Sequence, residues 1–197
     1  MRHLVALSEP EGSRNGLTPA QWSALRFFAS ANRFSRTVSA FAAYNVTSRG
    51  TASQTVKALE RHGYLCRETV TADKRSAYID LTESGRAKLA EDPAEVLATA
   101  IAALPEEARR GLDASLDQLV DRVAGAGGKD RFGTCPDCAY LETCPHEDGE
   151  SDCYYCRLTG EQVLPEELTA LCAAFRDEAP AGSGPEGGER GGGVSGG

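Results

Sequence analysis

The sequence predicts a mainly α-helical protein with one small β-hairpin, in the α+β class. Two observations predict this class: apolar residues recur at helical spacing over most of the chain, and two short β-like runs interrupt them between residues 64 and 81. A third observation concerns the C-terminal third, where five of the seven cysteines fall between residues 135 and 156. The 197 residues are enough for one domain with an appended module.

The N-terminal half contains three helical patterns. Thr18 followed by a proline is typical of a helix start, and apolar spacing from Trp22 onward predicts a helix over residues 18–31. Further helices are expected over residues 37–44 and 48–62, and the glycine that follows the third is a common helix-ending residue. The short connection between the second and third helices is that of a helix-turn-helix.

Two β-like runs, residues 64–70 and 76–81, follow the third helix on either side of a charged turn at residues 71–75. Such runs around a short turn predict a β-hairpin. Three helices followed by a hairpin are the layout of a winged helix-turn-helix, in which the hairpin is the wing. We therefore predict a DNA-binding domain of this type over residues 17–90, preceded by a flexible N-terminal arm over residues 1–16.

The helical pattern resumes beyond the hairpin. One helix is expected from Thr82 to about residue 90, and two more over residues 94–104 and 106–124. The last stretch carries one apolar stripe: Leu104, Ala108, Leu112, Leu116, Leu119 and Val123. Because a winged helix leaves so long a helix little to pack against, we predict that residues 91–125 are long C-terminal dimerisation helices.

The rest of the chain divides into two parts. After an expected linker at residues 125–128, a small cysteine-rich metal-binding module is predicted over residues 126–178, closing with a short helix over residues 165–177. Residues 179–197 form a glycine-rich tail, and a chain of that composition is expected to be disordered.

Charge is unevenly distributed along the chain. The whole sequence carries 29 Asp and Glu against 21 Lys and Arg, a net −8, which by itself argues against DNA binding because DNA repels anions. Residues 33–88 nevertheless carry 10 basic and 5 acidic groups, a net +5, whereas residues 134–197 carry 3 and 13, a net −10. The basic block coincides with the predicted winged helix, so we expect DNA to meet residues 33–88 and the acidic end to face away.

The third predicted helix has the composition of a recognition helix. If Ala52, Val56 and Leu59 are buried, the opposite face and the N-terminus present a polar set of candidate DNA contacts: Arg49, Thr51, Ser53, Gln54, Lys57 and Arg61. Gln and Arg side chains can bind base edges in the major groove, and Ser, Thr and Lys can bind phosphates. A helix N-terminus also favours phosphate through its free amides.

Three motifs carry a resemblance to a known family. The first two are the run Leu17–Trp22 at the entry of the first helix and the run Ser48–Val56 with its exit Leu59–Leu65. The third is the wing motif Asp73-Lys74-Arg75-Ser76, followed by Leu81-Thr82 and Gly85. In these motifs, over about residues 17–90, the chain resembles the MarR family of bacterial transcription regulators.

The resemblance implies roles for the wing and for the assembly. Lys74 and Arg75 would contact DNA, with Arg75 at the minor groove or its flanking phosphates, and Asp73 would shape the wing. An arginine at a hairpin tip suits the strongly negative potential of a narrow minor groove. MarR proteins are homodimers that place two recognition helices on a palindromic site in double-stranded DNA. Because only 16 residues precede the helix entry, we expect the dimer here to rest mainly on the C-terminal helices.

No run approaches the roughly 18 apolar residues of a membrane helix, and the first residues lack a signal peptide. We therefore expect a cytoplasmic protein without a membrane partner.

The cysteines indicate a metal site. In a reducing compartment, clustered cysteines indicate metal ligands or a redox switch. The candidate metal ligands are Cys135, Cys138, Cys144, Cys153 and Cys156. Cys66 and Cys172 are expected to be buried apolar residues, with metal ligation as the lesser alternative for Cys172.

Two kinds of metal centre fit these ligands. Cys135 with Cys138, and Cys153 with Cys156, have the spacing of a four-cysteine Zn²⁺ knuckle. Cys135, Cys138 and Cys144 instead have a C-x2-C-x5-C spacing that resembles the iron–sulfur segments of WhiB-type regulators and RecB-like nucleases. Cys153 or Cys156 would then complete a 4Fe-4S cluster. We favour the iron–sulfur cluster because it accounts for more of the cysteines, and we keep zinc as the alternative.

The leading hypothesis is a MarR-like, DNA-binding transcription regulator whose metal centre senses redox state or iron. In one alternative the same regulator has a purely structural zinc site, and in another the chain is a redox protein that uses the winged helix as a scaffold. We do not expect an enzyme, since the sequence contains no nucleotide-binding glycine loop, no paired catalytic carboxylates and no Ser/His/Asp set. Nothing in the sequence indicates a small-molecule effector.

Overall fold

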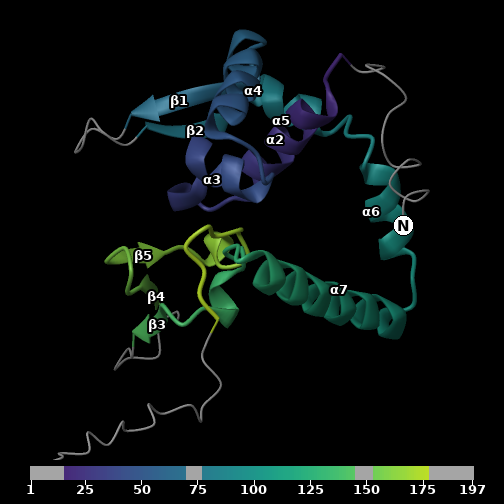
Figure 1. Ribbon diagram of the computed structural model, residues 1–197, viewed down its shortest axis with the longest axis vertical. Helices are drawn as coiled ribbons and strands as arrows, with labels where there is room; N and C mark the ends of the chain where they lie inside the picture. Colours follow the sequence, from purple (N-terminus) through teal and green to yellow (C-terminus); the bar gives the residue numbers. More distant parts are fainter. Residues whose placement is uncertain (1–15, 70–76, 145–152, 178–197) are drawn as a thin grey trace, which may run out of the picture.

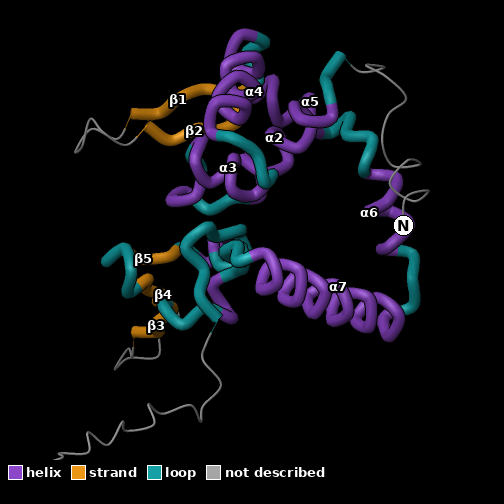
Figure 2. The backbone as a smooth tube through the Cα atoms, viewed as in Figure 1, coloured by secondary structure: helices purple, strands orange, loops and turns teal. Residues whose placement is uncertain are grey.

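The structure is a computed structural model that describes residues 16–69, 77–144 and 153–177. The chain runs from a helical lobe with a β-hairpin, through two further helices, to a small three-stranded sheet (Figure 1, Figure 2). The predictions for the N-terminal arm, for the tip of the wing and for the glycine-rich tail concern residues outside these ranges.

Three helices form the first part of the lobe: α2 (Pro19–Ser30), α3 (Val38–Tyr44) and α4 (Arg49–Arg61). Each follows a hydroxyl residue whose side chain accepts a hydrogen bond from the backbone N–H three residues later: Thr18, Thr37 and Ser48. These caps explain why the helices begin where the sequence predicted. A short 3-10 turn, η1 (Arg33–Ser35), connects α2 to α3.

The wing follows α4 as two antiparallel strands, β1 (Leu65–Thr69) and β2 (Ala77–Leu81). The register sets Leu65 opposite Leu81, and both side chains are buried against the lobe. Helix α5 (Glu83–Leu89) starts directly after β2. The strands confirm the predicted hairpin, while its charged turn lies outside the described residues.

The hydrophobic core lies between the helices and the base of the wing. Its largest fully buried side chains are Trp22, Leu25, Phe27, Phe28, Val56, Leu59 and Ile79. The ring of Phe27 lies 5.2 Å from that of Phe28 and 5.1 Å from that of Tyr44. Burial of one such side chain contributes about 1.5–3 kcal/mol to the free energy of folding, so this cluster stabilises the lobe.

Helices α6 (Glu95–Ala102) and α7 (Glu106–Gly127) then leave the lobe, and no residue of either helix is buried in the chain as described. An ion pair between Arg26 and Asp92 fastens the chain just before α6, with contacts of 2.5 and 2.6 Å. Burial by itself would raise the pKa of Asp92, but hydrogen bonds from Arg26 and from the Ala94 backbone lower it overall. Asp92 is therefore a charged anchor for the two helices.

The predicted linker at residues 125–128 is wrong, because α7 continues through Gly127. A glycine inside a helix costs only about 1 kcal/mol relative to alanine, which the preceding turns of a long helix can tolerate. The helix ends at Gly128, whose φ of 58° lies in the left-handed region that glycine adopts without strain.

The small sheet has the order β3 (Leu141–Cys144), β4 (Cys153–Cys156) and β5 (Glu161–Val163), with both pairs antiparallel. Two 3-10 turns flank it: η2 (Cys135–Asp137) before the sheet and η3 (Pro165–Glu167) after it. We call residues 129–177 the cysteine module. None of these three strands was predicted from the sequence.

The predicted helix over residues 165–177 is wrong. Beyond η3 the chain forms isolated β-bridges, which pair Leu171 with Ala31, Cys172 with Gly133 and Asp177 with Cys138. We call residues 168–177 the strap. Its apolar residues recur at helical spacing, but its backbone groups pair with segments distant in the sequence, which periodicity cannot reveal.

The cysteine module lies against the α3 side of the lobe, and α7 runs back to it from α6 (Figure 1). Backbone hydrogen bonds between the strap and the end of α2 join the two parts. In the described ranges, no helix combines the length and the apolar character that a membrane span requires.

Replacing Gly85 with alanine is expected to destabilise the lobe. A Cβ atom at this buried glycine of α5 would lie 2.0 Å from the Tyr64 carbonyl oxygen, so the backbone would have to move. We expect the free energy of unfolding, measured by chemical denaturation, to fall by about 2 kcal/mol or more. The control is Gly111→Ala in α7, where a Cβ atom meets nothing within 4 Å. Alanine should stabilise that helix by about 0.5–1 kcal/mol, and equal effects at the two positions would contradict the prediction.

Candidate DNA-binding face and cysteine pocket

The polar side of α4 faces solvent. Its predicted inner residues, Ala52, Val56 and Leu59, are at most 1% exposed, which confirms the predicted buried face. Five predicted DNA contacts are exposed: Arg49, Thr51, Gln54, Lys57 and Arg61. Ser53, the sixth predicted contact on this helix, is partly buried.

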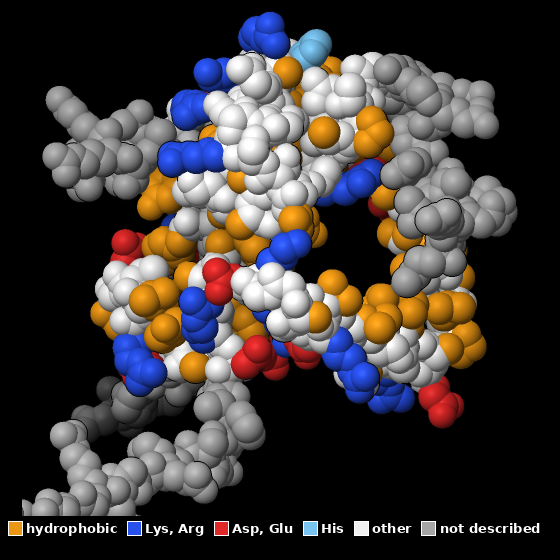
Figure 3. Space-filling model, viewed as in Figure 1, with side chains coloured by type: hydrophobic (Ala, Val, Ile, Leu, Met, Phe, Trp, Pro, Cys, Tyr) orange, Lys and Arg blue, Asp and Glu red, His pale blue; other side chains and the backbone are white. Residues whose placement is uncertain are grey.

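The exposed side of α4 carries a shallow depression lined by Gln54, Lys57, Glu60 and Arg61. The Glu60 carboxylate accepts a hydrogen bond from the Arg67 side chain of β1 at 2.6 Å, so its negative charge is compensated. Lys and Arg side chains gather at this end of the molecule (Figure 3). Such a surface can bind phosphates and present amide and guanidinium groups to base edges.

The predicted wing contacts cannot be placed in the same way. Asp73, Lys74 and Arg75 lie outside the described residues, between the ends of β1 and β2. The two strands follow α4, and the last described pair of the hairpin sets Thr69 opposite Ala77. The roles of the three residues in DNA binding stay predictions.

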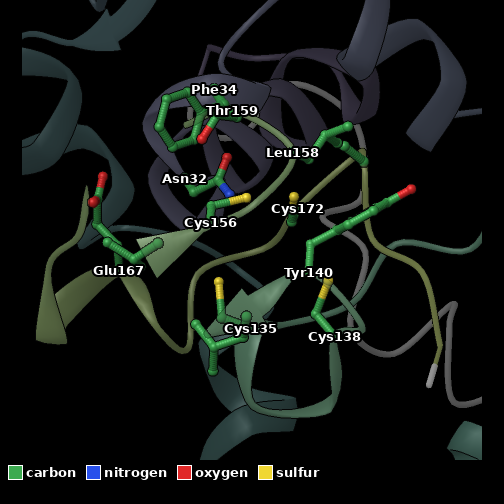
Figure 4. Close-up of a pocket in the computed structure, with 13 residues that line it drawn as sticks. Asn32, Phe34, Cys135, Cys138, Tyr140, Cys156, Leu158, Thr159, Glu167 and Cys172 are labelled. Carbon is green, nitrogen blue, oxygen red and sulfur yellow. The ribbon is translucent and has the colours of Figure 1, made fainter. Parts of the chain in front are cut away.

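A pocket of about 40 Å³ in the cysteine module is lined by four thiols. Cys135 and Cys138 come from η2 and its C-terminal cap, Cys156 comes from the end of β4, and Cys172 comes from the strap. Figure 4 shows the four sulfur atoms facing the same space. Two residues of the lobe also line the pocket: Asn32 and Phe34. The pocket therefore lies where the module meets the α2–α3 connection.

The other thiols of the pocket affect the ionisation of Cys135. Burial, together with the charges of Cys172, Cys138, Cys156 and Glu167, raises the pKa of the Cys135 thiol to about 11. Several thiolates can share such a space only with a cation among them. Among the described residues, no three Cys, His, Asp or Glu side chains are gathered tightly enough to hold a metal ion as they stand.

The structure brings together three of the five predicted ligands and separates a fourth from them. Cys153 and Cys156 lie three residues apart on β4, and because side chains alternate between the two faces of a strand, they point to opposite faces. Cys153 is disulfide-bonded and does not line the pocket. Its neighbour across the sheet is Cys144, whose side chain lies outside the described residues. The zinc-knuckle interpretation rested on the spacing of Cys153 and Cys156, which lie on a strand in the structure.

Cys172 lines the pocket, although the sequence predicted mainly a buried apolar residue at this position. It belongs to no CxxC motif, so spacing carried no signal for it. Its backbone N–H donates to the Gly133 carbonyl at 2.8 Å, which sets its side chain beside Cys135. Cys66, also expected to be buried, is partly exposed.

Backbone hydrogen bonds hold the strap to the end of α2. Leu171 donates its N–H to the Ser30 carbonyl at 2.8 Å, and its own carbonyl accepts the N–H of Asn32 at 2.9 Å. The Ala173 N–H donates to the Ser35 hydroxyl oxygen at 2.9 Å. Cys172 lies between these two strap residues, so its backbone is fixed relative to the α2–α3 connection.

Arg33 adds a charged contact at the same place. Its guanidinium donates to the Glu167 carboxylate at 2.5 Å and to the Gln162 carbonyl at 2.6 Å. The Glu167 side chain is 16% exposed and that of Arg33 is 33% exposed, so solvent screens the pair only in part. One side chain of the lobe thereby binds both β5 and η3.

The apolar stripe of α7 is exposed and borders a groove. Leu116, Leu119 and Val123 are 44, 49 and 71% exposed. With Tyr44 and Phe132 they line a groove of about 570 Å³ between α7 and the end of α3. Hydrophobic side chains gather along the side of α7 that faces the lobe (Figure 3). Among the described residues, the stripe is therefore not part of a core.

Comparisons with known proteins agree with the architecture of the lobe. Residues 15–76 match the model of the MarR family. A MarR/EmrR family transcriptional regulator from Acinetobacter sp. ADP1 has a similar structure, with a TM-score of 0.50 and 24% identity over 63% of this chain and 88% of that chain. The structure of Staphylococcus aureus MarR in complex with salicylate and kanamycin is also similar. Its TM-score is 0.50, with 20% identity over 63% of this chain and 85% of that chain. No curated protein matches the chain. The lobe thus has the winged-helix fold of MarR proteins, and the family match ends before the cysteine module.

Replacing Arg33 with glutamine is expected to loosen the strap. The variant loses the charged contacts to Glu167 and Gln162, and we expect the free energy of unfolding to fall by about 1 kcal/mol. Amide hydrogen exchange at Leu171 and Ala173 should accelerate by about fivefold. The control is Arg61→Gln on α4, which removes the same charge away from the strap. Unchanged exchange at both strap amides in Arg33→Gln would contradict the prediction.

Proposed function

We propose that this chain, in which residues 15–76 match the MarR family model, is a homodimeric transcription regulator that binds a palindromic site in double-stranded DNA. The observation that carries the proposal is the exposed polar side of α4, with Gln54, Lys57 and Arg61 on one surface. The Acinetobacter protein with a similar fold is itself a transcriptional regulator. No catalytic role is proposed.

In the proposed complex α4 lies in the major groove. Gln54 can form a bidentate pair with adenine, and Arg61 can bind guanine or a phosphate. Lys57 would bind a phosphate, and Arg49 would do so beside the N-terminal amides of α4. The wing residues would reach the adjacent minor groove, as the family resemblance implies.

The charge distribution supports this orientation. The net +5 of residues 33–88 belongs to the lobe that carries α4, whereas the net −10 of residues 134–197 belongs largely to the cysteine module and the tail. In Figure 1 the module lies on the opposite side of the lobe from α4. A phosphate backbone along α4 is therefore kept away from the acidic module.

The exposed stripe of α7 supports a dimer. Four residues of the stripe are more than 40% exposed: Leu116, Leu119, Val120 and Val123. Burial of this apolar surface in an interface would contribute about 25 cal/mol of stabilising free energy per Å². In a homodimer a second copy covers the stripe and the groove beside it. The same contact sets the distance between the two recognition helices, which must match the spacing of the two half-sites.

The cysteine module would tune this activity through a metal centre. We propose a Cys-ligated metal whose gain, loss or oxidation shifts the population between two arrangements of the recognition helices, in response to redox state or iron supply. Attachment of the strap to the α2–α3 connection supports a link between the two parts. The spacing of the cysteines in the sequence favoured an iron–sulfur cluster, with zinc as the alternative. Among the described residues, the pocket contains Cys172 in place of Cys144 and Cys153, and this change of ligands favours the zinc alternative.

DNA binding is tested with alanine variants of α4. We expect Gln54→Ala to lower affinity for a duplex selected by the wild-type protein from a random pool by about 5- to 150-fold, the effect of losing one bidentate base contact. Lys57→Ala should weaken binding to all sequences and reduce the slope of log affinity against log salt by about one. Fluorescence anisotropy at several stated salt concentrations measures both effects.

The control for these variants is Lys129→Ala, which removes the same charge at an exposed position after α7. It should leave both the affinity and the salt slope unchanged. If Lys57→Ala and Lys129→Ala behave alike, α4 is not the DNA-binding surface.

The dimer is tested with Leu119→Glu, which introduces a charge into the exposed stripe of α7. We expect the wild-type protein to have twice the mass of one chain in light scattering, and the variant to have the mass of one chain at the same concentration. Gln118→Glu, at the adjacent exposed position, adds the same charge outside the stripe and should stay dimeric. A wild-type monomer over the micromolar range is the result that rejects the dimer.

A further inference from the structure

We infer that Cys135, Cys138, Cys156 and Cys172 together bind a single tetrahedral Zn²⁺ ion, and that this ion clamps the strap onto the winged helix. This ligand set differs from both sets that the sequence predicted, because it includes Cys172 and omits Cys144 and Cys153. The four thiols come from three separate segments and line one cavity. Sulfur atoms from several segments around one small space are the arrangement of a structural zinc site.

The local backbone supports ligation at three of these positions. The Cys138 N–H donates to the Cys135 carbonyl at 3.0 Å, which closes a tight turn with one thiol at each end. The Gly160 N–H donates to the Cys156 carbonyl at 2.9 Å, and the φ of Gly160 is 73°, so a second tight turn starts at Cys156. Short turns of this kind leave little freedom to the thiols that they carry, which lowers the entropic cost of ligation.

The module needs a stabilising element beyond its hydrophobic core. Among the described residues from 129 onward, the buried apolar side chains are Cys138, Val163 and Phe175. Three buried side chains are a small core for a segment of this length, because every ordered residue costs conformational entropy. A structural zinc ion adds binding free energy directly to the folded state of a small domain, so it can supplement such a core.

The size of the cavity favours one ion over a cluster. The volume of about 40 Å³ is a few times the ~10–15 Å³ needed for one water molecule. A 4Fe-4S cluster contains eight iron and sulfur atoms and would have to displace the surrounding chain, including Leu141 and Val163, which also line the pocket. One Zn²⁺ ion needs much less room, because four thiolates close around it at Zn–S distances of about 2.3 Å.

The position of Cys172 couples this site to the lobe. The two strap residues on either side of it, Leu171 and Ala173, are hydrogen-bonded to the α2–α3 connection. A Zn–S bond at Cys172 therefore fixes the module to the segment that leads into α3 and from there into the recognition helix. Without the ion, the junction keeps its hydrogen bonds, the Arg33–Glu167 pair and the packing of Leu171 and Ala173 against the core of the lobe. The coupling to DNA rests on the function proposed above, whereas the ligand set does not.

The ligand set is tested on the full-length protein with Co²⁺ and Zn²⁺ alone. The wild-type protein should bind one ion per chain, and Co²⁺ should give the visible bands and thiolate charge transfer of a tetrahedral four-sulfur site. Cys172→Ser should lower Zn²⁺ affinity by about tenfold or more and change the Co²⁺ spectrum. Cys153→Ser and Cys66→Ser should leave both the stoichiometry and the spectrum as in the wild type.

The opposite pattern would overturn the inference: loss of metal in Cys153→Ser with retention in Cys172→Ser identifies the zinc-knuckle set. If anaerobically purified protein contains iron and sulfide in the ratio of a 4Fe-4S cluster, the inference of a single Zn²⁺ ion is wrong. If Cys172→Ser does not fold, Cys172→His provides the test, because a histidine ligand should retain one Co²⁺ with a shifted spectrum. These readouts contain no DNA, so a protein that binds one Zn²⁺ but no duplex refutes the proposed function and leaves the site in place.

The clamp is tested by hydrogen exchange with and without Zn²⁺. Removal of the ion by a chelator should accelerate exchange at Leu171, Ala173 and Asn32 by about tenfold or more, while core amides of α4 such as Val56 change little. Equal protection of the three junction amides in the zinc-bound and zinc-free protein overturns the clamp even if the ligand set is correct.

Discussion

The arrangement of the molecule depends on the backbone pairing between the strap and the end of α2. Leu171 exchanges hydrogen bonds with Ser30 and Asn32, and Ala173 binds Ser35. The segment beyond α7 has few buried apolar side chains, so it is ordered by contact with the lobe rather than by a core of its own. The position of the cysteine pocket and the return of α7 toward the lobe both follow from this junction.

The junction also gives a physical basis for communication between two chemically different parts. The winged helix is basic and carries the polar side of α4, whereas the cysteine module is acidic and carries the thiols. A ligand can change DNA binding only if its affinity differs between the arrangements that the protein adopts. The proposed metal, held in part by Cys172, would favour the arrangement in which the strap is fastened beside the turn that leads into α3. In a dimer, a small displacement there would change the distance between two recognition helices.

The sequence was informative wherever local physics decides structure. Hydroxyl caps at Thr18, Thr37 and Ser48 mark the starts of the helices, and apolar spacing predicts that Ala52, Val56 and Leu59 face inward. Gly85 belongs to the wing motif for a reason that only the structure shows, namely its close approach to the Tyr64 carbonyl. The predicted linker at residues 125–128 was wrong because the cost of two glycines did not outweigh an established helix.

By itself the sequence determined the winged helix, the exposed composition of the recognition helix, the apolar stripe of α7 and the clustering of thiols after residue 134. Only the tertiary structure decided which thiols share a pocket. Cys153 and Cys156 have the spacing of a knuckle but lie on a strand, where residues three apart point to opposite faces. Cys172 has no motif and reaches the pocket through pairing with Gly133, far away in the sequence. Helix caps and periodicity are local and can be read along a chain, whereas the grouping of ligands depends on non-local backbone pairing.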